Sequence, residues 1–128
     1  MRSILMDTCV FLWWISDDHR LGQLAKKIIA NPATSVYVSA ATPWEIGIKR
    51  CLGKLQAPDN IDTIIEESGF KPLSISCFHA KNAAQLPAHH KDPFDRVMIA
   101  QAQAEGLEVL TADTQFLQYG IRVIEARS

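Results

Sequence analysis

Residues 3–16 read Ser-Ile-Leu-Met-Asp-Thr-Cys-Val-Phe-Leu-Trp-Trp-Ile-Ser, and this stretch decides the fold class. Its first four residues form a short apolar run that is typical of a buried strand, and the residues from Thr8 onward are typical of a helix. Asp7 stands between the two predicted elements. A strand that passes directly into a helix is the first half of a βαβ unit, in which the helix leads to a parallel strand.

The same order of short strands and longer helices continues along the chain. The expected strands are residues 3–6, 35–38, 71–75, 108–110 and 122–124. The expected helices are Thr8–Ser16, Leu21–Ala30, Ala40–Leu52, Ile61–Ser68, Cys77–Leu86 and Pro93–Glu105. Pro72 limits the third strand to a sheet edge or to the start of a strand. The sequence therefore predicts an α/β fold with a parallel sheet that helices cover on both faces.

Composition fits one globular domain over residues 1–128, since the chain is 48% hydrophobic and 21% charged. Thirteen Lys and Arg against 14 Asp and Glu give a net charge of -1, so bulk positive charge cannot hold a nucleic acid. The three cysteines have no CxxC pair, so we expect core positions for them and a reducing cytoplasm. No apolar run is long enough to span a membrane, and the N-terminus does not resemble a signal peptide.

Acidic residues recur where strands end and helices begin, and each alone has a structural explanation. Asp7, Asp92 and Asp113 each precede a helix or turn, where a carboxylate caps free backbone N–H groups. The sequence Thr42-Pro43-Trp44-Glu45 fits a capping box with proline at the first helical position. Capping is therefore the simplest interpretation of any one of these residues.

Four of the acids together predict a site. A helix that follows a strand starts at the carboxyl edge of a parallel sheet, which places Asp7, Glu45 and Asp113 there. Asp95 opens the helix that leads into the strand at 108–110, so it starts at the same edge. Clustered carboxylates repel one another unless cations neutralise them, and their hard oxygens suit Mg²⁺ or Mn²⁺. The pattern therefore favours a metal-dependent nuclease.

Four segments that span nearly the whole chain carry a family resemblance. They are Ile4-Leu5-Met6-Asp7-Thr8, Trp44–Lys49 with Gly53-Lys54-Leu55, Asp92-Pro93-Phe94-Asp95-Arg96 through Ala100-Gln101-Ala102, and Leu110-Thr111-Ala112-Asp113. In this order they resemble the PIN-domain ribonucleases of the VapC toxin type. The resemblance implies a three-layer α/β/α sandwich with a central parallel sheet. It also implies Mg²⁺- or Mn²⁺-dependent endoribonuclease activity, as the toxin of a type II toxin–antitoxin pair.

The resemblance also implies residue roles and partners. Asp7, Glu45, Asp95 and Asp113 match the family's catalytic, metal-binding quartet, with Asp7 and Asp95 as the main ligands. The expected partners are RNA and a small inhibitory antitoxin, in a homodimer and a toxin–antitoxin hetero-oligomer, with no membrane association. The RNA target and the number of ions, one or two, stay open. Further candidates for supporting the site or contacting substrate are Thr8, Thr111, Asp92, Arg96 and Lys49.

Basic and histidine side chains near the acids allow two interpretations. They could form a solvated face, or they could hold RNA phosphates beside the acidic pocket, with Arg96 as the best candidate. His89 and His90 could contact metal or phosphate, although a histidine pair in an exposed loop is more often solvated. The basic side chains concerned are Lys49, Arg50, Lys54, Lys91 and Arg96.

The alternative function is a PIN-fold module that binds RNA or protein without catalysis. Two other classes fit less well. Response-regulator receivers resemble a pattern with paired acids after the first strand and a lysine after the last, whereas Thr8-Cys9 and Glu125 stand there. Haloacid-dehalogenase phosphatases require an aspartate two residues after the first, and that position is Cys9.

The run Cys9–Ile15 is apolar all round, although a surface helix needs only one apolar stripe. Trp13 and Trp14 project about 100° apart, so we expect at least one of them to reach the surface. An exposed tryptophan is a favoured anchor for a partner, here an amphipathic antitoxin segment with a basic side chain that neutralises the acids. The structural alternative is that the helix at Leu21–Ala30 covers the whole patch.

Overall fold

The computed structural model describes residues 2–128, and its centre is a parallel sheet. The strands are β1 (Arg2–Met6), β2 (Thr34–Ser39), β3 (Lys71–Leu73), β4 (Glu108–Thr111) and β5 (Val123–Glu125). Their order in the sheet is β3-β2-β1-β4-β5, and every neighbouring pair is parallel. Strand β3, which contains Pro72, lies at one edge as the sequence predicts.

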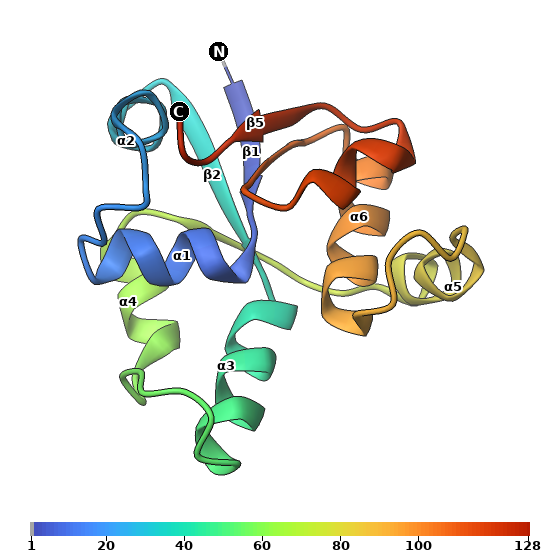
Figure 1. Ribbon diagram of the computed structural model, residues 1–128, viewed down its shortest axis with the longest axis horizontal. Coiled ribbons are helices and arrows are strands. Elements are labelled where there is room, and N and C mark those ends of the chain that lie inside the picture. The colour runs from blue at the N-terminus through green and yellow to red at the C-terminus, as the bar shows by residue number, and fades with distance from the viewer. Residues whose placement is uncertain (1) are drawn as a thin grey trace.

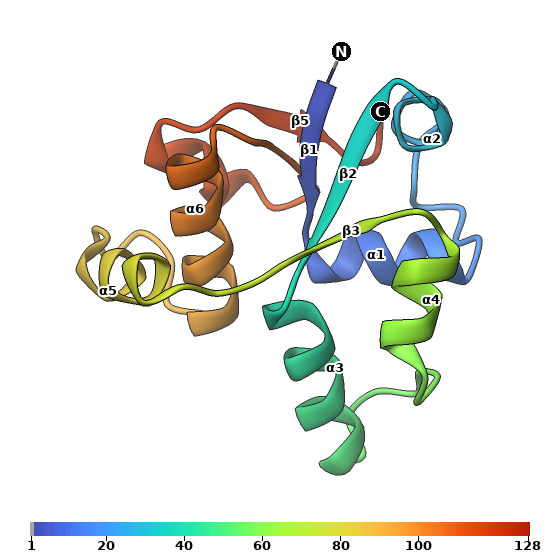
Figure 2. The same cartoon turned by 180° about the vertical axis from the view of Figure 1, so that it is seen from behind.

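Helices cover both faces of this sheet (Figures 1 and 2). The α-helices are α1 (Thr8–Ile15), α2 (Gln23–Ala30), α3 (Ala41–Cys51), α4 (Ile61–Glu67), α5 (Cys77–Gln85) and α6 (Pro93–Glu105), and η1 (Thr114–Tyr119) is a 3₁₀-helix. Helices α1, α2 and α4 lie on one side, and α5 and α6 lie on the other. The three-layer α/β/α sandwich predicted from the sequence is therefore confirmed.

Alternation along the strands builds the two cores. Ile4 and Met6 of β1 pack into the core beneath α1, α2 and α4, whereas Leu5 packs into the core beneath α6. The parallel register pairs Met6 with Leu110 and Leu5 with Val109, so the β4 side chains divide in the same way. Successive side chains of a strand point to opposite faces, so one short apolar run supplies both layers.

Two local predictions are wrong. Helix α3 begins at Ala41, so Thr42 and Pro43 lie inside its first turn and Glu45 takes no part in a capping box. The Ser39 hydroxyl accepts the Ala41 N–H instead, because it lies at the end of β2. The three cysteines are exposed rather than in the core. Cysteine is one of the residue types most often buried, so the residue type alone favoured core positions.

No helix within residues 2–128 is long and apolar enough to cross a membrane.

Candidate active site

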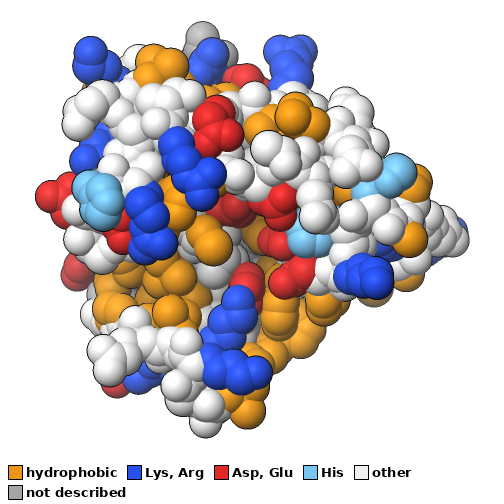
Figure 3. Space-filling model, viewed as in Figure 1, with side chains coloured by type: hydrophobic (Ala, Val, Ile, Leu, Met, Phe, Trp, Pro, Cys, Tyr) orange, Lys and Arg blue, Asp and Glu red, His pale blue; other side chains and the backbone are white. Residues whose placement is uncertain are grey.

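The four acids of the predicted quartet come together where the chain leaves β1 and β4. Asp7 follows β1, Asp113 follows β4, Asp95 lies in the first turn of α6, and Glu45 lies in α3. In Figure 3 the acidic side chains gather in a hollow of the surface, next to a histidine and between apolar areas. The topology explains this convergence, because parallel strands deliver their carboxyl ends to one edge.

Asp7 is buried and held from two sides. One oxygen accepts the Val10 N–H at 2.8 Å, which caps α1, and the other accepts the Thr111 hydroxyl. Burial raises the pKa of the Asp7 carboxyl to about 6, although both hydrogen bonds oppose the rise. The Thr111 hydroxyl also accepts the Asp113 N–H at 3.0 Å, so one threonine links two acids of the cluster.

Asp92 and Asp95 divide two tasks at the start of α6. Asp92 caps the helix by accepting the N–H groups of Phe94 (2.8 Å) and Asp95 (3.2 Å). The Asp95 side chain is therefore free of capping. Burial, followed by repulsion from the neighbouring acids, raises the pKa of Asp95 to about 8. Asp95 is thus the member of the cluster that most resists ionisation without a cation.

Glu45 contributes a buried carboxyl from α3. Its Oε2 accepts a hydrogen bond from Lys49 Nζ at 2.5 Å, one helical turn later, and this bond raises the pKa of Lys49. Its Oε1 is buried and has no hydrogen-bond partner among the described residues. A buried carboxylate oxygen with no partner is costly unless a cation neutralises it, so Oε1 is suited to be a metal ligand.

Asp113 completes the cluster and brings a histidine with it. One oxygen accepts the Gln115 N–H at 2.9 Å and caps η1. The other lies 2.8 Å from His90 Nε2, and this nitrogen is also 3.1 Å from Asp95 Oδ2. A nitrogen and two carboxylate oxygens from three segments thus lie within 4.8 Å of one another, close enough to share one ion.

The sequence model of the PIN domain matches residues 4–121, nearly the whole chain. The chain belongs to the PIN-domain family. Solved structures agree with this assignment at the level of the fold. VapBC2 from Rickettsia felis, bound to a promoter DNA fragment, aligns with a TM-score of 0.71 and 13% identity, over 96% of this chain and 98% of that chain.

Two further complexes have similar folds. DNA-bound VapBC from Salmonella typhimurium gives a TM-score of 0.66 and 22% identity, over 98% of each chain. VapBC-5 from Mycobacterium tuberculosis, a member of the VapBC family of toxin-antitoxin systems, gives 0.62 and 19%, over 98% of this chain and 99% of that chain. A comparison with curated proteins gives no significant match.

The PIN domain uses Arg96 differently from the sequence expectation. Its guanidinium donates hydrogen bonds to four backbone carbonyls, one in the last turn of α5 and three in the loop before α6, at 2.7–3.1 Å. These bonds occupy the group that was the best candidate for an RNA phosphate contact, so that prediction is wrong. The carbonyl groups belong to Ala83, Leu86, Pro87 and His90.

The histidine pair also differs from the expected solvated pair. His89 is exposed, but the His90 side chain is only 11% exposed and points into the cluster. The sequence gives little signal for this difference, because the two histidines are adjacent in a polar loop. Tyr119 accounts for the difference, because its hydroxyl accepts the His90 N–H at 2.7 Å while its ring packs edge-on against His89.

The remaining candidates have clear places in the site. The Thr8 and Thr42 hydroxyls are hydrogen-bonded at 3.1 Å, which ties the start of α1 to α3 beside the acids. Arg50, Lys54 and Lys91 are exposed and form no ion pair within residues 2–128. The carboxylate oxygens of the cluster fit a hard divalent cation such as Mg²⁺ or Mn²⁺.

Proposed function

We propose that this PIN domain is a metal-dependent endoribonuclease that acts as the toxin of a toxin–antitoxin pair. The observation that carries the proposal is the carboxyl cluster itself. Glu45 Oε1 is buried without a partner, and the pKa values of Asp7 and Asp95 are raised to about 6 and about 8. A divalent cation would stabilise such a cluster by neutralising its charge, and Mg²⁺ or Mn²⁺ suits its oxygens.

The proposed roles follow from how each acid is held. Asp7 and Asp95 are the main ligands, because hydrogen bonds from Val10 and Thr111 fix Asp7 and the Asp92 cap leaves Asp95 free. Glu45 and Asp113 complete the pocket, directly or through water. A bound cation would lower the pKa of a water and offset the charge of the scissile phosphate.

The protein supplies binding and orientation for a polyanionic substrate. Arg50, Lys54 and Lys91 are the exposed cations near the acids, so they are the proposed contacts to RNA phosphates. Lys49 instead offsets the charge of Glu45, which lowers repulsion within the cluster. Hydrolysis by water leaves 5′-phosphate and 3′-hydroxyl ends and makes no use of the RNA 2′-hydroxyl.

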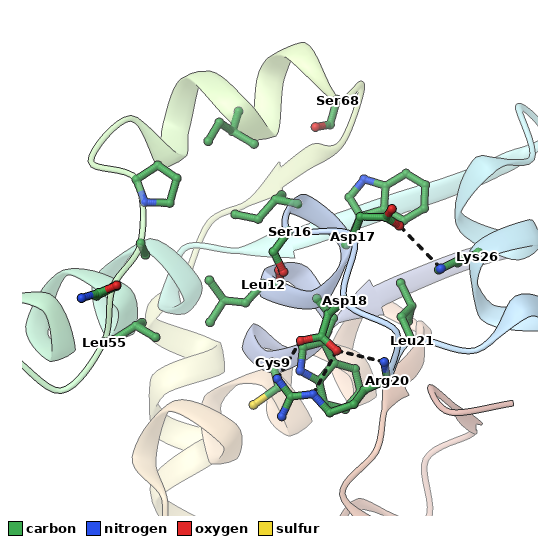
Figure 4. Close-up of a pocket in the computed structure, with 17 residues that line it drawn as sticks. Cys9, Leu12, Ser16, Asp17, Asp18, Arg20, Leu21, Lys26, Leu55 and Ser68 are labelled. Atoms are coloured by element: carbon green, nitrogen blue, oxygen red, sulfur yellow. Dashed lines mark hydrogen bonds and ion pairs between the residues drawn. The ribbon is translucent and has the colours of Figure 1, made fainter.

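A groove beside the acids supports an antitoxin partner (Figure 4). It has a volume of about 940 Å³, and apolar side chains of α1 and α4, with Leu55 and Ala57 before α4, form its walls. Cys9 lies on its lining, and partial burial and the charges of Asp7 and Asp95 raise the pKa of its thiol, so this end of the groove lies near the acidic cluster. We infer that an amphipathic antitoxin segment lies here with a basic side chain on the acids; the similar VapBC-5 structure belongs to a family of toxin-antitoxin systems.

Both tryptophans line this groove, and one of them reaches the surface, as the sequence predicts. Trp13 is buried, with the guanidinium groups of Arg20 and Arg127 5.1 and 5.8 Å from its ring. Trp14 is half-buried against Phe70 and is the tryptophan that keeps surface in the groove. We infer that Trp14 is the anchor for the antitoxin segment. We further propose that the chain forms a homodimer that assembles with its antitoxin in the cytoplasm.

Cleavage by the purified, antitoxin-free chain tests the proposal. RNA should be cut with Mg²⁺ or Mn²⁺ and left intact with EDTA. Asp7→Asn or Asp95→Asn should lower the rate at least ~10²-fold while circular dichroism shows a folded protein, because each removes a ligand. Undiminished cleavage by both variants would refute the site. RNA binding without cleavage, equal in wild type and variants, would instead support a non-catalytic binding module.

A further inference from the structure

His90 is fixed in its loop through both its backbone and its ring. Its backbone N–H donates to the Tyr119 hydroxyl at 2.7 Å, and its carbonyl accepts a bond from Arg96 at 3.0 Å. Tyr119 donates in turn to the Pro87 carbonyl at 2.8 Å. The ring packs edge-on against Phe116, with 5.7 Å between centroids. A loop that would otherwise be free is thus fixed around one imidazole.

The backbone also sets which ring nitrogen carries the proton. Asp92 donates its N–H to His90 Nδ1 at 3.3 Å, so Nδ1 offers a lone pair and Nε2 carries the hydrogen. Nε2 faces Asp113 Oδ2 at 2.8 Å and Asp95 Oδ2 at 3.1 Å. The Nε2–H group therefore lies between two carboxyl oxygens from different elements.

We propose that His90 is a positioning residue that holds Asp95 and Asp113 together in the metal-free protein, in place of the divalent cation. The proposal rests on the metal site of the proposed function and adds a role for a residue outside the quartet. Asp95 belongs to α6 and Asp113 follows β4, so the histidine, 3.1 and 2.8 Å from their carboxyl oxygens, bridges two elements of the fold. Arg96 and Tyr119 serve this role by fixing the loop.

A residue that takes the place of a cation differs from an ordinary structural contact in its effect on cation affinity. The bridge stabilises the metal-free state, and an incoming cation competes with the Nε2–H for the same two oxygens. Removing His90 therefore lowers the stability of the metal-free protein and, at the same time, tightens the binding of the cation. A direct ligand would show the opposite change in affinity, because its loss removes a bond to the ion.

The experiment compares wild type with His90→Ala, His90→Gln and His89→Ala, using Mn²⁺ alone as the probe and no RNA. The melting temperature in EDTA should fall by about 5–10 °C for His90→Ala, the loss expected for a hydrogen bond to a charged group in a chain of this size. Calorimetric titration should show Mn²⁺ binding about three- to tenfold tighter. His90→Gln, whose amide N–H can reach the same oxygens, should recover most of both changes, and His89→Ala should change neither.

Three results would overturn the proposal. Weaker Mn²⁺ binding by His90→Ala would make His90 a ligand, whereas a lower melting temperature with unchanged affinity would make it an ordinary structural contact. Unchanged behaviour in both assays would make the contact inconsequential. If wild type binds no Mn²⁺, the proposed metal site fails instead. The bridge is then decided by a double-mutant cycle in EDTA, where His90→Ala and Asp113→Asn should have non-additive effects on melting.

Discussion

Replacing Asp95 with asparagine should stabilise the metal-free protein at pH 8 and leave it nearly unchanged at pH 5. In the folded protein, burial and the neighbouring acids raise the pKa of Asp95 from 3.8 to about 8. Between these values the unfolded chain releases the Asp95 proton and the folded chain keeps it. The stability of wild type therefore falls as pH rises through this window, and a neutral asparagine avoids the loss.

The magnitude follows from the size of the shift. Each pKa unit corresponds to about 1.4 kcal/mol, so a shift of roughly four units sets a ceiling near 6 kcal/mol. The side chain is 21% exposed and can relax, so solvent screening reduces this ceiling. We expect Asp95→Asn to gain about 1–3 kcal/mol at pH 8, equivalent to about 3–10 °C in melting temperature.

The assay is thermal melting in EDTA at pH 5, 6, 7 and 8, with Glu66→Gln as the control for an exposed acid on α4. The difference between Asp95→Asn and wild type should grow steadily with pH, whereas the control should follow wild type. Excess Mn²⁺ should reverse the order at pH 8, because only wild type keeps the full ligand set. A melting difference that does not depend on pH, or an Asp95→Asn variant that is less stable at pH 8, would refute the reasoning.

Two further predictions concern Glu45 and the groove. Glu45→Gln should lower the cleavage rate at least ~10-fold and leave the metal-free melting temperature within about 2 °C of wild type, or raise it. The reason is that Glu45 does not cap α3 and its removal relieves repulsion among the acids. A clear loss of melting temperature with normal cleavage would contradict this prediction. Trp14→Ala should require at least ~10-fold more antitoxin for half-inhibition, with no loss of cleavage rate. Trp44→Ala removes a 57% exposed tryptophan outside the groove and should need no more antitoxin than wild type. Equal inhibition of both variants would exclude Trp14 as the anchor.

The fold was predictable because its signals are local. Apolar runs such as residues 3–6 and 35–38 are short, and the Asp92-Pro93 cap marks the start of α6 unambiguously. The parallel topology then brings the ends of β1 and β4 together, so the convergence of Asp7 and Asp113 also followed from the sequence. Capping and clustering proved compatible, since both residues use one oxygen as a cap and keep the other toward the site.

The details that were wrong depend on contacts between distant segments. The prediction that Arg96 contacts a phosphate was wrong because the four carbonyls that it binds lie in α5 and the loop before α6. No local sequence pattern predicts the conformation of that loop. His90 differs from His89 through Tyr119, 29 residues away. The capping box at Thr42 fitted the sequence rules, but the Thr42 hydroxyl is hydrogen-bonded to Thr8 and the helix starts at Ala41, two residues before Pro43. Tertiary hydrogen bonds of this kind override local preference.

The chemistry of the RNA ends tests the central claim most directly. A 5′-labelled and a 3′-labelled copy of one RNA are incubated with the purified chain and Mn²⁺, with Asp95→Asn and EDTA as parallel controls, and the new ends are mapped. Hydrolysis at a metal site predicts 5′-phosphate and 3′-hydroxyl ends that are absent from both controls. Ends with a 5′-hydroxyl and a 2′,3′-cyclic phosphate, or cleavage that persists in EDTA, would contradict a carboxylate-bound cation as the catalyst.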